Sequence, residues 1–332
     1  AGWRLPNACD LLRWSLCVVQ EVVSTAIMTL EQSLEELGRD EEGSKHSFLV
    51  HLSSLNDEEM DQFRTWWPSL PRDRRRMLIG RLVTVAEDNV EMDYIGVFRY
   101  CLKDDDPKVR ELAVSGLWEC DDHNLVGPLM TIAKYDPSDD VRMSAVLALG
   151  KFGALAESGK LLQRDGERIK DALLSLLEDS RGSIEVRRRA LEAVACFATP
   201  QVQELIQWAY NSPDIKLKVS ALYAMGRTSD PAWMSTLIKE MSSVEASMRY
   251  EAASACGEMG EEDAVPYMIP LIEDEDSQVQ VAAIKGLGVI GGSLAERALK
   301  LYVKAGDEVI QEAAQEALQQ LDMEEDTPGF TP

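Results

Sequence analysis

A short apolar pattern recurs seven times in this chain of 332 residues and limits its fold more than any other feature. The copies begin at Val109, Val141, Val186, Leu217, Met248, Val279 and Ile310. Successive copies are therefore 32, 45, 31, 31, 31 and 31 residues apart. A nearly constant period of this length indicates repeated units that stack along the chain.

Each copy has the residue spacing of an amphipathic helix. With the first residue of a copy counted as position 0, positions 0, +4, +5 and +8 are apolar in nearly every copy, which is one helical face. Position +4 is always Ala and position +7 is always Gly or Ala, so we expect neighbouring helices to approach closely. Position +1 is Arg or Lys in five of the seven copies and usually follows an acidic residue, which predicts ion pairs within or between units.

A second apolar helix precedes each of these copies. Residues 234, 237, 238 and 241 are apolar before the copy at Met248, and residues 265, 268, 269 and 272 repeat that spacing before Val279. Pro270 lies deep in such a helix and should distort it. A unit of two helices cannot bury both of its faces alone, so neighbouring units must stack. The sequence therefore predicts an all-α fold, an α-solenoid or superhelix of stacked helix pairs.

The stretch "DDVRMSAVLALG" at 139–150 resembles HEAT repeats, in particular the short repeats of phycobilisome-lyase-like proteins with an armadillo-type fold. The resemblance extends over roughly residues 90–321. It implies a scaffold or adaptor function, and chromophore attachment in a minority of such proteins. The seventh copy has Gln311 in place of Arg and lacks the terminal glycines, as expected of a C-terminal cap.

The stretch "GLGVIGG" at 286–292 has the glycine spacing of a dinucleotide-binding loop. Such a loop must follow a strand and open a helix. Here the spacing Gly/Ala-x-Gly-x-x-Gly occurs three times, ending at Gly153, Gly260 and Gly291, and each time near the end of a predicted helix. We therefore expect these glycines to terminate helices rather than to bind a nucleotide.

The pattern also predicts the organisation of the chain. We expect residues 1–27 to be a non-native or disordered extension, residues 28–89 a helical cap with a degenerate repeat, and residues 90–322 the repeat array. Fourteen extra residues near 154–168 should form a bulging loop or an extra helix, and residues 323–332 a disordered acidic tail. Trp66 and Trp67 are expected to pack within the cap.

Charge and composition favour some partners over others. The 58 acidic and 34 basic residues give a net charge of −24, which disfavours nucleic acid and membrane partners and favours basic proteins. The basic run Arg72, Arg74, Arg75 and Arg76 is interpreted as a solvated helix start. Six cysteines without a CxxC motif are interpreted as reduced thiols of a cytoplasmic protein.

We expect no metal, no cofactor and no enzymatic activity. The chain has three histidines, and the adjacent residues of "CDDH" at 120–123 cannot all bind one ion. The sequence contains no HExxH motif or P-loop, and it suggests no Ser/His/Asp or Cys/His catalytic set. A scaffold requires only a binding surface.

That surface is predicted at positions +2 and +6, opposite the buried face of each copy and on the concave side of the solenoid. The predicted partner-binding residues are Met143, Leu147, Arg188, Val219, Tyr223, Tyr250 and Val281. Exposed apolar and aromatic residues in a row favour a protein or peptide partner, expected to be basic with apolar side chains. The other interpretation of the row is packing between adjacent helices.

The function predicted from the sequence is thus a non-catalytic scaffold or adaptor. The alternative is a phycobilin-lyase-like HEAT protein that binds or attaches a tetrapyrrole, with Cys196 or Cys256 involved. Both cysteines fall at or beside core positions, which argues against a reactive thiol.

Overall fold

The computed structural model describes residues 29–39, 46–179, 182–304 and 308–325. Every regular element within these ranges is a helix. The chain divides into two compact units at residues 122 and 123. The predicted extension at 1–27 lies outside the described residues.

The first unit holds the predicted cap helices and the first copy of the pattern. Its elements are α2 (Leu30–Arg39), α3 (His46–Leu49), η1 (Val50–Leu52), α4 (Asp57–Trp66), η2 (Trp67–Ser69), α5 (Arg72–Asp88), α6 (Ile95–Cys101) and α7 (Pro107–Gly116). Asn56 caps α4 in a reciprocal capping box with Glu59, and Asp106 caps α7. Trp67 is buried against Phe63, which confirms its predicted role in cap packing.

The second unit holds the other six copies. Its elements are η3 (His123–Leu125), α8 (Val126–Tyr135), α9 (Asp139–Glu157), α10 (Gln163–Glu178), α11 (Ile184–Val194), η4 (Ala195–Phe197), α12 (Pro200–Tyr210), α13 (Ile215–Thr228), η5 (Pro231–Trp233), α14 (Met234–Glu240), α15 (Ala246–Met259), η6 (Glu262–Ala264), α16 (Val265–Met268), η7 (Ile269–Glu273), α17 (Ser277–Ile290), α18 (Gly292–Tyr302) and α19 (Glu308–Glu325).

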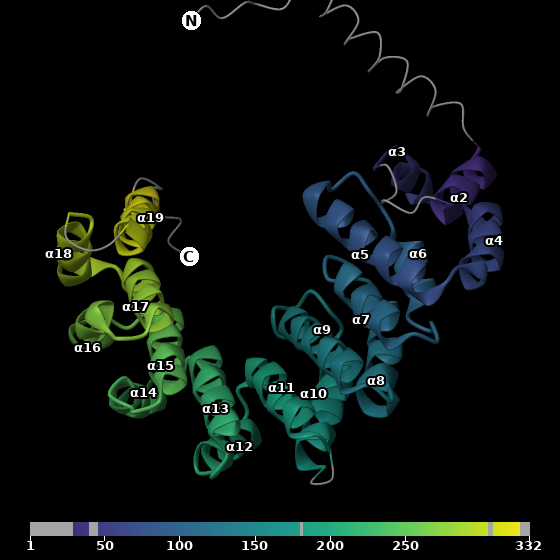
Figure 1. Ribbon diagram of the computed structural model, residues 1–332. Coiled ribbons are helices and arrows are strands. Elements are labelled where there is room, and N and C mark those ends of the chain that lie inside the picture. The colour runs from purple at the N-terminus through teal and green to yellow at the C-terminus, as the bar shows by residue number, and fades with distance from the viewer. Residues whose placement is uncertain (1–28, 40–45, 180–181, 305–307, 326–332) are drawn as a thin grey trace, which may run out of the picture. The chain divides into compact units, whose positions relative to one another are not determined.

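Helices in this unit lie in two layers (Figure 1). The helices that carry the pattern, α9, α11, α13, α15, α17 and α19, are called the second helices here. They pack on one another in chain order, and the other layer contains α10, α12, α14, α16 and α18. This arrangement confirms the predicted α-solenoid of stacked helix pairs.

Burial follows the predicted apolar face. The alanine at position +4 is fully buried in all seven copies, and position 0 is buried in each. In α19 this burial ends on one side, because Gln315 at position +5 and Gln319 at position +9 are exposed. The seventh copy therefore presents a polar outer side, as expected of a C-terminal cap.

Glycine at position +9 sets the distance between neighbouring second helices. A methyl group added at Gly257 would lie 2.7 Å from Cα of Gly286, and one added at Gly226 would lie 2.8 Å from Cα of Ala255. Gly150 faces Ala193 and Gly288 faces Ala317 in the same way. In each pair the glycine at +9 meets the small residue at +7 of the next copy. The repeated spacing therefore allows direct contact between the two helix backbones.

This contact corrects part of the expectation for the glycine-rich spacing. Gly260 and Gly291 do end their helices with positive φ values of 70° and 69°, as predicted. Gly153 does not, because α9 continues to Glu157 and Gly153 packs against Cys196 and Phe197. The middle glycines serve close helix packing instead of termination.

The proline and the extra residues also have clear outcomes. The α-helical turn of α16 changes to the 3₁₀ segment η7 at Pro270, which confirms the predicted distortion. The extra residues near 154–168 do not form a bulging loop or a separate helix. They lie in the end of α9, the short connection at 158–162 and the start of α10, and buried Gly166 packs on Ala156.

Two expected boundaries differ from the structure. The contact groups divide at 122/123, whereas the sequence places the boundary between cap and array at 89/90. Helix α19 runs to Glu325, three residues into the expected tail, and residues 326–332 lie outside the described part. The remaining domain assignments stay predictions.

Ion pairs link successive copies through an aspartate that precedes the helix cap. Arg249 on α15 donates two hydrogen bonds of 2.7 Å to Asp274, which lies two residues before the α17 cap residue Asp276. In the first unit, Arg75 on α5 contacts Asp104 at 2.7 Å in the same way, and Asp104 lies two residues before the α7 cap residue Asp106. Both carboxylates also accept a hydrogen bond from the backbone amide of the cap residue.

The basic run at Arg72–Arg76 begins α5, as predicted, and Arg72 and Arg76 are exposed. The run is not solvated throughout, because Arg75 is buried between Asp104 and Asp105, and Arg76 pairs with buried Asp106 at 2.6 Å. Arg74 donates to the carbonyl of Leu37. These arginines are paired because the acidic residues before the first copy lie next to them in the fold. The two groups are about 30 residues apart in the sequence, so a short stretch of sequence does not show the pairing.

We expect Gly257→Ala to destabilise the protein by about 1–3 kcal/mol, because the added methyl overlaps the backbone of the next helix. Gly127→Ala in α8 is the control, since a methyl there meets nothing within 4 Å and should change stability by less than about 1 kcal/mol. Chemical denaturation of both variants measures the difference. Equal effects would contradict the proposed role of the +9 glycine.

We expect Arg249→Met to cost about 3–5 kcal/mol, because it leaves the buried Asp274 carboxylate unpaired. The pairing lowers the pKa of Asp274, so its stabilisation is present above the unfolded-state pKa of about 3.9 and is lost as pH falls through the lower folded-state value. The free energy of unfolding of the variant should lack this acid-sensitive contribution. Lys300→Met removes an exposed ion pair and should cost less than about 1 kcal/mol; a similar loss in both variants would refute the prediction.

Candidate functional site

The predicted partner-binding residues all lie on second helices of the second unit. Met143 and Leu147 are on α9, Arg188 on α11, Val219 and Tyr223 on α13, Tyr250 on α15 and Val281 on α17. Leu147 and Tyr250 are 41% and 40% exposed, and the other five are half-buried. The stacking of these helices in chain order brings residues from five copies onto successive elements.

Charged side chains accompany this row at its centre. Arg188 pairs with Glu185 at 3.0 Å and donates to the Ser220 hydroxyl at 3.1 Å. Arg189 pairs with Glu192 at 2.6 Å, and the Ser220 hydroxyl donates to the same Glu192 carboxylate. This network joins α11 to α13. Arg188 is thus already held by protein groups and fixes the position of its neighbours.

Glu251 on α15 has a different environment. It is half-buried, and no hydrogen bond or ion pair to its carboxylate is found within the described residues. Burial, followed by the negative charges of Glu192 and Glu258, raises the pKa of the Glu251 carboxyl to about 7, although Arg188 and Arg189 oppose this. Two acids and two arginines therefore act on this carboxyl with opposite effects on its pKa.

Tyr223 lies among these acids. Its phenol is half-buried, and burial raises its pKa. Among the charged groups, Arg227 lowers this pKa, whereas Glu258, Glu192 and Glu251 raise it, so charged residues of α11, α13 and α15 act on one phenol. We call Glu192, Tyr223, Glu251 and Glu258 the acidic centre. The sequence analysis found Tyr223 but missed the three acids, because the abundance of Asp and Glu hid that Glu192 and Glu251 would be half-buried near exposed Glu258.

The cysteines considered for chromophore attachment do not have the environment of a nucleophile. Cys256 is fully buried, and burial raises its pKa to about 12. Burial likewise raises the pKa of Cys196 to about 12. A thiolate is the reactive form of cysteine, and both environments disfavour it.

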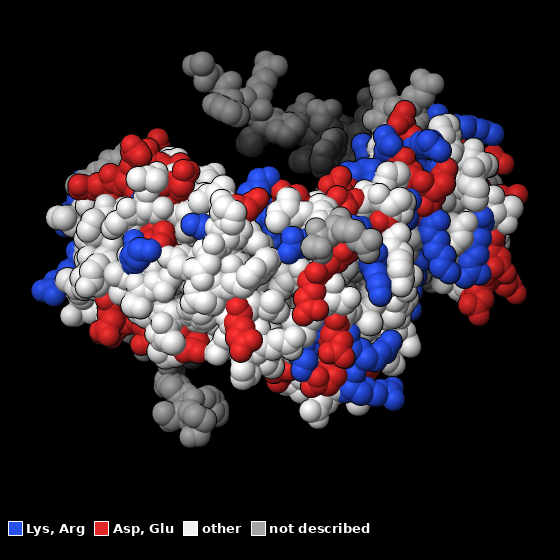
Figure 2. All heavy atoms as spheres, turned by 90° about the horizontal axis from the view of Figure 1, so that it is seen from below, with Lys and Arg blue, Asp and Glu red and all other residues white. Residues whose placement is uncertain are grey.

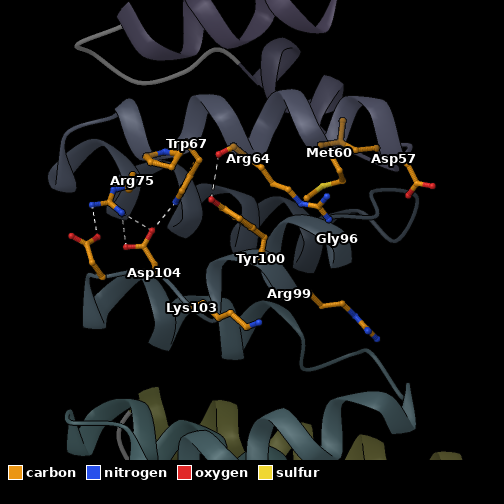
Figure 3. Close-up of a pocket in the computed structure, with 13 residues that line it drawn as sticks. Asp57, Met60, Arg64, Trp67, Arg75, Gly96, Arg99, Tyr100, Lys103 and Asp104 are labelled. Carbon is orange, nitrogen blue, oxygen red and sulfur yellow. Dashed lines mark hydrogen bonds and ion pairs between the residues drawn. The ribbon is translucent and has the colours of Figure 1, made fainter.

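A cavity of about 840 Å³ lies in the first unit between α4 and α6 (Figure 3). On one side Asp104 accepts hydrogen bonds from the Trp67 indole and from Arg75, both at 2.7 Å. Two further cations at the cavity are paired, Arg64 with Asp61 and Arg99 with Asp122. The cavity is therefore polar but largely neutralised by its own ion pairs. Sequence reasoning missed it because α4 and α6 are separated by the long helix α5.

Surface charge is unevenly distributed despite the net charge of −24. On the face drawn in Figure 2, groups of acidic and basic side chains alternate with broad uncharged areas. Attraction of a basic partner thus depends on local acidic groups rather than on a uniformly negative surface.

No group of three or more His, Cys, Asp or Glu residues in the part of the chain that the structure describes is placed to hold a metal ion. None of the helices described is both long and apolar enough to cross a membrane.

Comparison with known proteins identifies the repeats. The family described as HEAT repeats matches residues 97–164 and 234–319. No curated protein sequence matches the chain.

Several solved structures are similar in fold. Human deoxyhypusine hydroxylase in complex with glycerol is 17% identical, with a TM-score of 0.35, over 89% of this chain and 97% of that one. The CpcE and CpcF complex of phycocyanin lyase from Nostoc sp. PCC7120 is 18% identical, with a TM-score of 0.45, over 69% of this chain and 94% of that one. A chain of the Kap95p complex with RanGDP is 15% identical, with a TM-score of 0.40, over 96% of this chain and 44% of that one. At these identities the similarity concerns the helical repeat fold alone.

We expect Glu251→Gln to stabilise the folded protein at pH 8. A carboxyl whose folded pKa is raised destabilises the fold progressively as pH increases from the unfolded value near 4.3 through about 7. The amide variant should remove this pH dependence and leave stability unchanged below pH 4. Urea denaturation at pH 4, 6 and 8 measures it, with exposed Glu261→Gln as control; a variant less stable than wild type at pH 8 would contradict the assignment.

Proposed function

We propose that this chain, a HEAT-repeat protein, is a non-catalytic scaffold that binds a protein or peptide segment along its second helices. Half-buried Glu251 supports the proposal most directly, because its carboxyl, which ionises near pH 7, is acted on by two other acids and has no ion pair within the described residues. A Lys or Arg side chain from a partner would supply the paired cation. Tyr223 beside it would pack on the aliphatic part of the same side chain.

Apolar residues on both sides of the acidic centre define the rest of the proposed surface. Leu147 lies toward the N-terminal end of the array and Tyr250 and Val281 toward its C-terminal end. A matching partner segment would carry apolar side chains on both sides of a basic one. Exposed tyrosines are frequent energetic centres of such interfaces, which favours Tyr250 as a main contact.

Chromophore attachment, the alternative considered from the sequence, receives less support. The burial and raised pKa values of Cys196 and Cys256 disfavour a thioether-forming role, and no other observation favours it. A spectral shift on mixing the protein with a bilin would revive this alternative. The cytoplasm stays the predicted location.

We expect Tyr223→Ala with Tyr250→Ala to reduce partner affinity at least about tenfold, because truncation of a buried interface tyrosine typically costs more than 1–2 kcal/mol. The partner would first be identified by affinity purification from the native source and mass spectrometry, and its binding then measured by calorimetry with purified components. Tyr135→Ala with Tyr267→Ala removes two exposed tyrosines from α8 and α16 and is the matched control.

The binding should also strengthen as pH rises from 6 to 8, as Glu251 becomes charged, and Glu251→Gln should abolish this dependence. If the double variant on the second helices stays folded and binds the partner as well as wild type does, this surface is not the binding site.

A further inference from the structure

A second cavity, of about 560 Å³, lies in the first unit, and none of the proposed partner-binding residues lines it. It is bounded by the end of α5, the turn that follows, the start of α6 and the segment after α7. Its walls are mainly apolar and include Val83, Ala86, Met92 and Phe98. A concave apolar site of this volume is in the range of small-molecule sites in proteins.

The cavity coincides with a departure from the repeat pattern. Position +9 of the first copy is Trp118, where four later copies carry the glycine that contacts the next helix. Trp118 is 48% exposed and lines the cavity. Position +7 keeps its small residue, Gly116, whose space is occupied by the Phe98 ring, since a methyl added there would lie 2.5 Å from that ring. The first copy thus presents aromatic groups to a cavity instead of a flat packing surface.

The charged groups of this cavity all have one sign. Glu87, Asp93 and Glu119 line it, and no Lys or Arg does. None of these three carboxylates forms an ion pair within the described residues, and Asp93 accepts a hydrogen bond from the Ile95 amide. The exposed carboxylates of Glu87 and Glu119 therefore favour a positively charged ligand at the cavity entrance.

Tyr94 provides a polar group at the cavity wall. Its side chain is 1% exposed, and its hydroxyl has no hydrogen-bond partner within the described residues. Burial raises the pKa of Tyr94 to about 12, so the hydroxyl stays protonated and can both donate and accept. A buried polar group without a partner is unfavourable. The hydroxyl is covered by protein atoms in this structure, so a ligand that gives it a partner must displace the side chains that cover it.

We propose that this cavity binds a small organic cation with an aromatic body, an ammonium group beside Glu87 and Glu119, and a polar group that reaches the Tyr94 hydroxyl. The apolar walls take the body, and Trp118 and Phe98 offer aromatic faces to it. The proposal does not depend on the scaffold function, because none of these residues belongs to the second helices of the second unit.

Three probes that differ in one group each would test it by calorimetry with the full chain. They are tyramine, phenethylamine, which lacks the hydroxyl, and 4-hydroxyphenylpropionate, which carries a carboxylate in place of the amine. We expect tyramine to bind at least about tenfold more tightly than the carboxylate. It should bind about two- to tenfold more tightly than phenethylamine, the range of one neutral hydrogen bond.

Variants then test which side chains contact the hydroxyl and the ammonium group of the ligand. Tyr94→Phe should remove the difference between tyramine and phenethylamine and should not lower the melting temperature, because the hydroxyl lost has no protein partner. Glu87→Gln with Glu119→Gln should weaken both amines at least about threefold. Glu58→Gln with Glu91→Gln changes the net charge equally at exposed positions outside the cavity and should leave affinity unchanged.

Several results would overturn the proposal. These are equal affinity for the amine and the carboxylate, no binding of either amine at millimolar concentration, or equal losses in the two double variants. Binding of a lysine-containing peptide in the absence of amine binding would also overturn it, because the site would then recognise a protein segment rather than a small molecule.

Discussion

The contact between a glycine at position +9 and the small residue at +7 of the next copy determines how the second helices stack. Gly150, Gly226, Gly257 and Gly288 each bring a helix backbone against Ala or Gly of its neighbour. At this separation the alanines at +4 are excluded from solvent in every copy. Larger residues at either position would separate the helices and open the core between them, so both the stack and the surface above it depend on these contacts.

Close stacking brings charged residues of separate copies together. The Arg249–Asp274 and Arg75–Asp104 pairs form because each arginine reaches the turn before the next helix that carries the pattern, α17 or α7. The same proximity gathers Glu192, Tyr223, Glu251 and Glu258 from three successive helices. In the turns an arginine neutralises the acids. On the second helices Glu251 has no ion pair within the described residues, and its pKa is raised to about 7. Its ionised form is therefore a cost for the fold, which a cationic partner would offset.

The repeat pattern is interrupted at two places, and the structure differs from a uniform array at both. Trp118 replaces the +9 glycine in the first copy, and an apolar cavity with an acidic entrance lies there. The extra residues after the second copy lie in the end of α9, the short connection at 158–162 and the start of α10 rather than in a bulging loop. The first outcome follows from size, because a bulky aromatic residue cannot occupy the space of a glycine.

The period, the apolar positions and the invariant alanines were enough to predict the helix pairs and their stacking, because each unit must bury its face against the next unit in the chain. Position along a helix also predicted that Leu147 and Tyr250 would be exposed. Which charges meet was decided only by tertiary structure: the arginines of α5 were expected in solvent and are paired, and the acids around Glu251 could not be distinguished from the other carboxylates. Pairing and burial of charges depend on the distance between helices, and that distance results from packing several units together, which no single stretch of sequence contains.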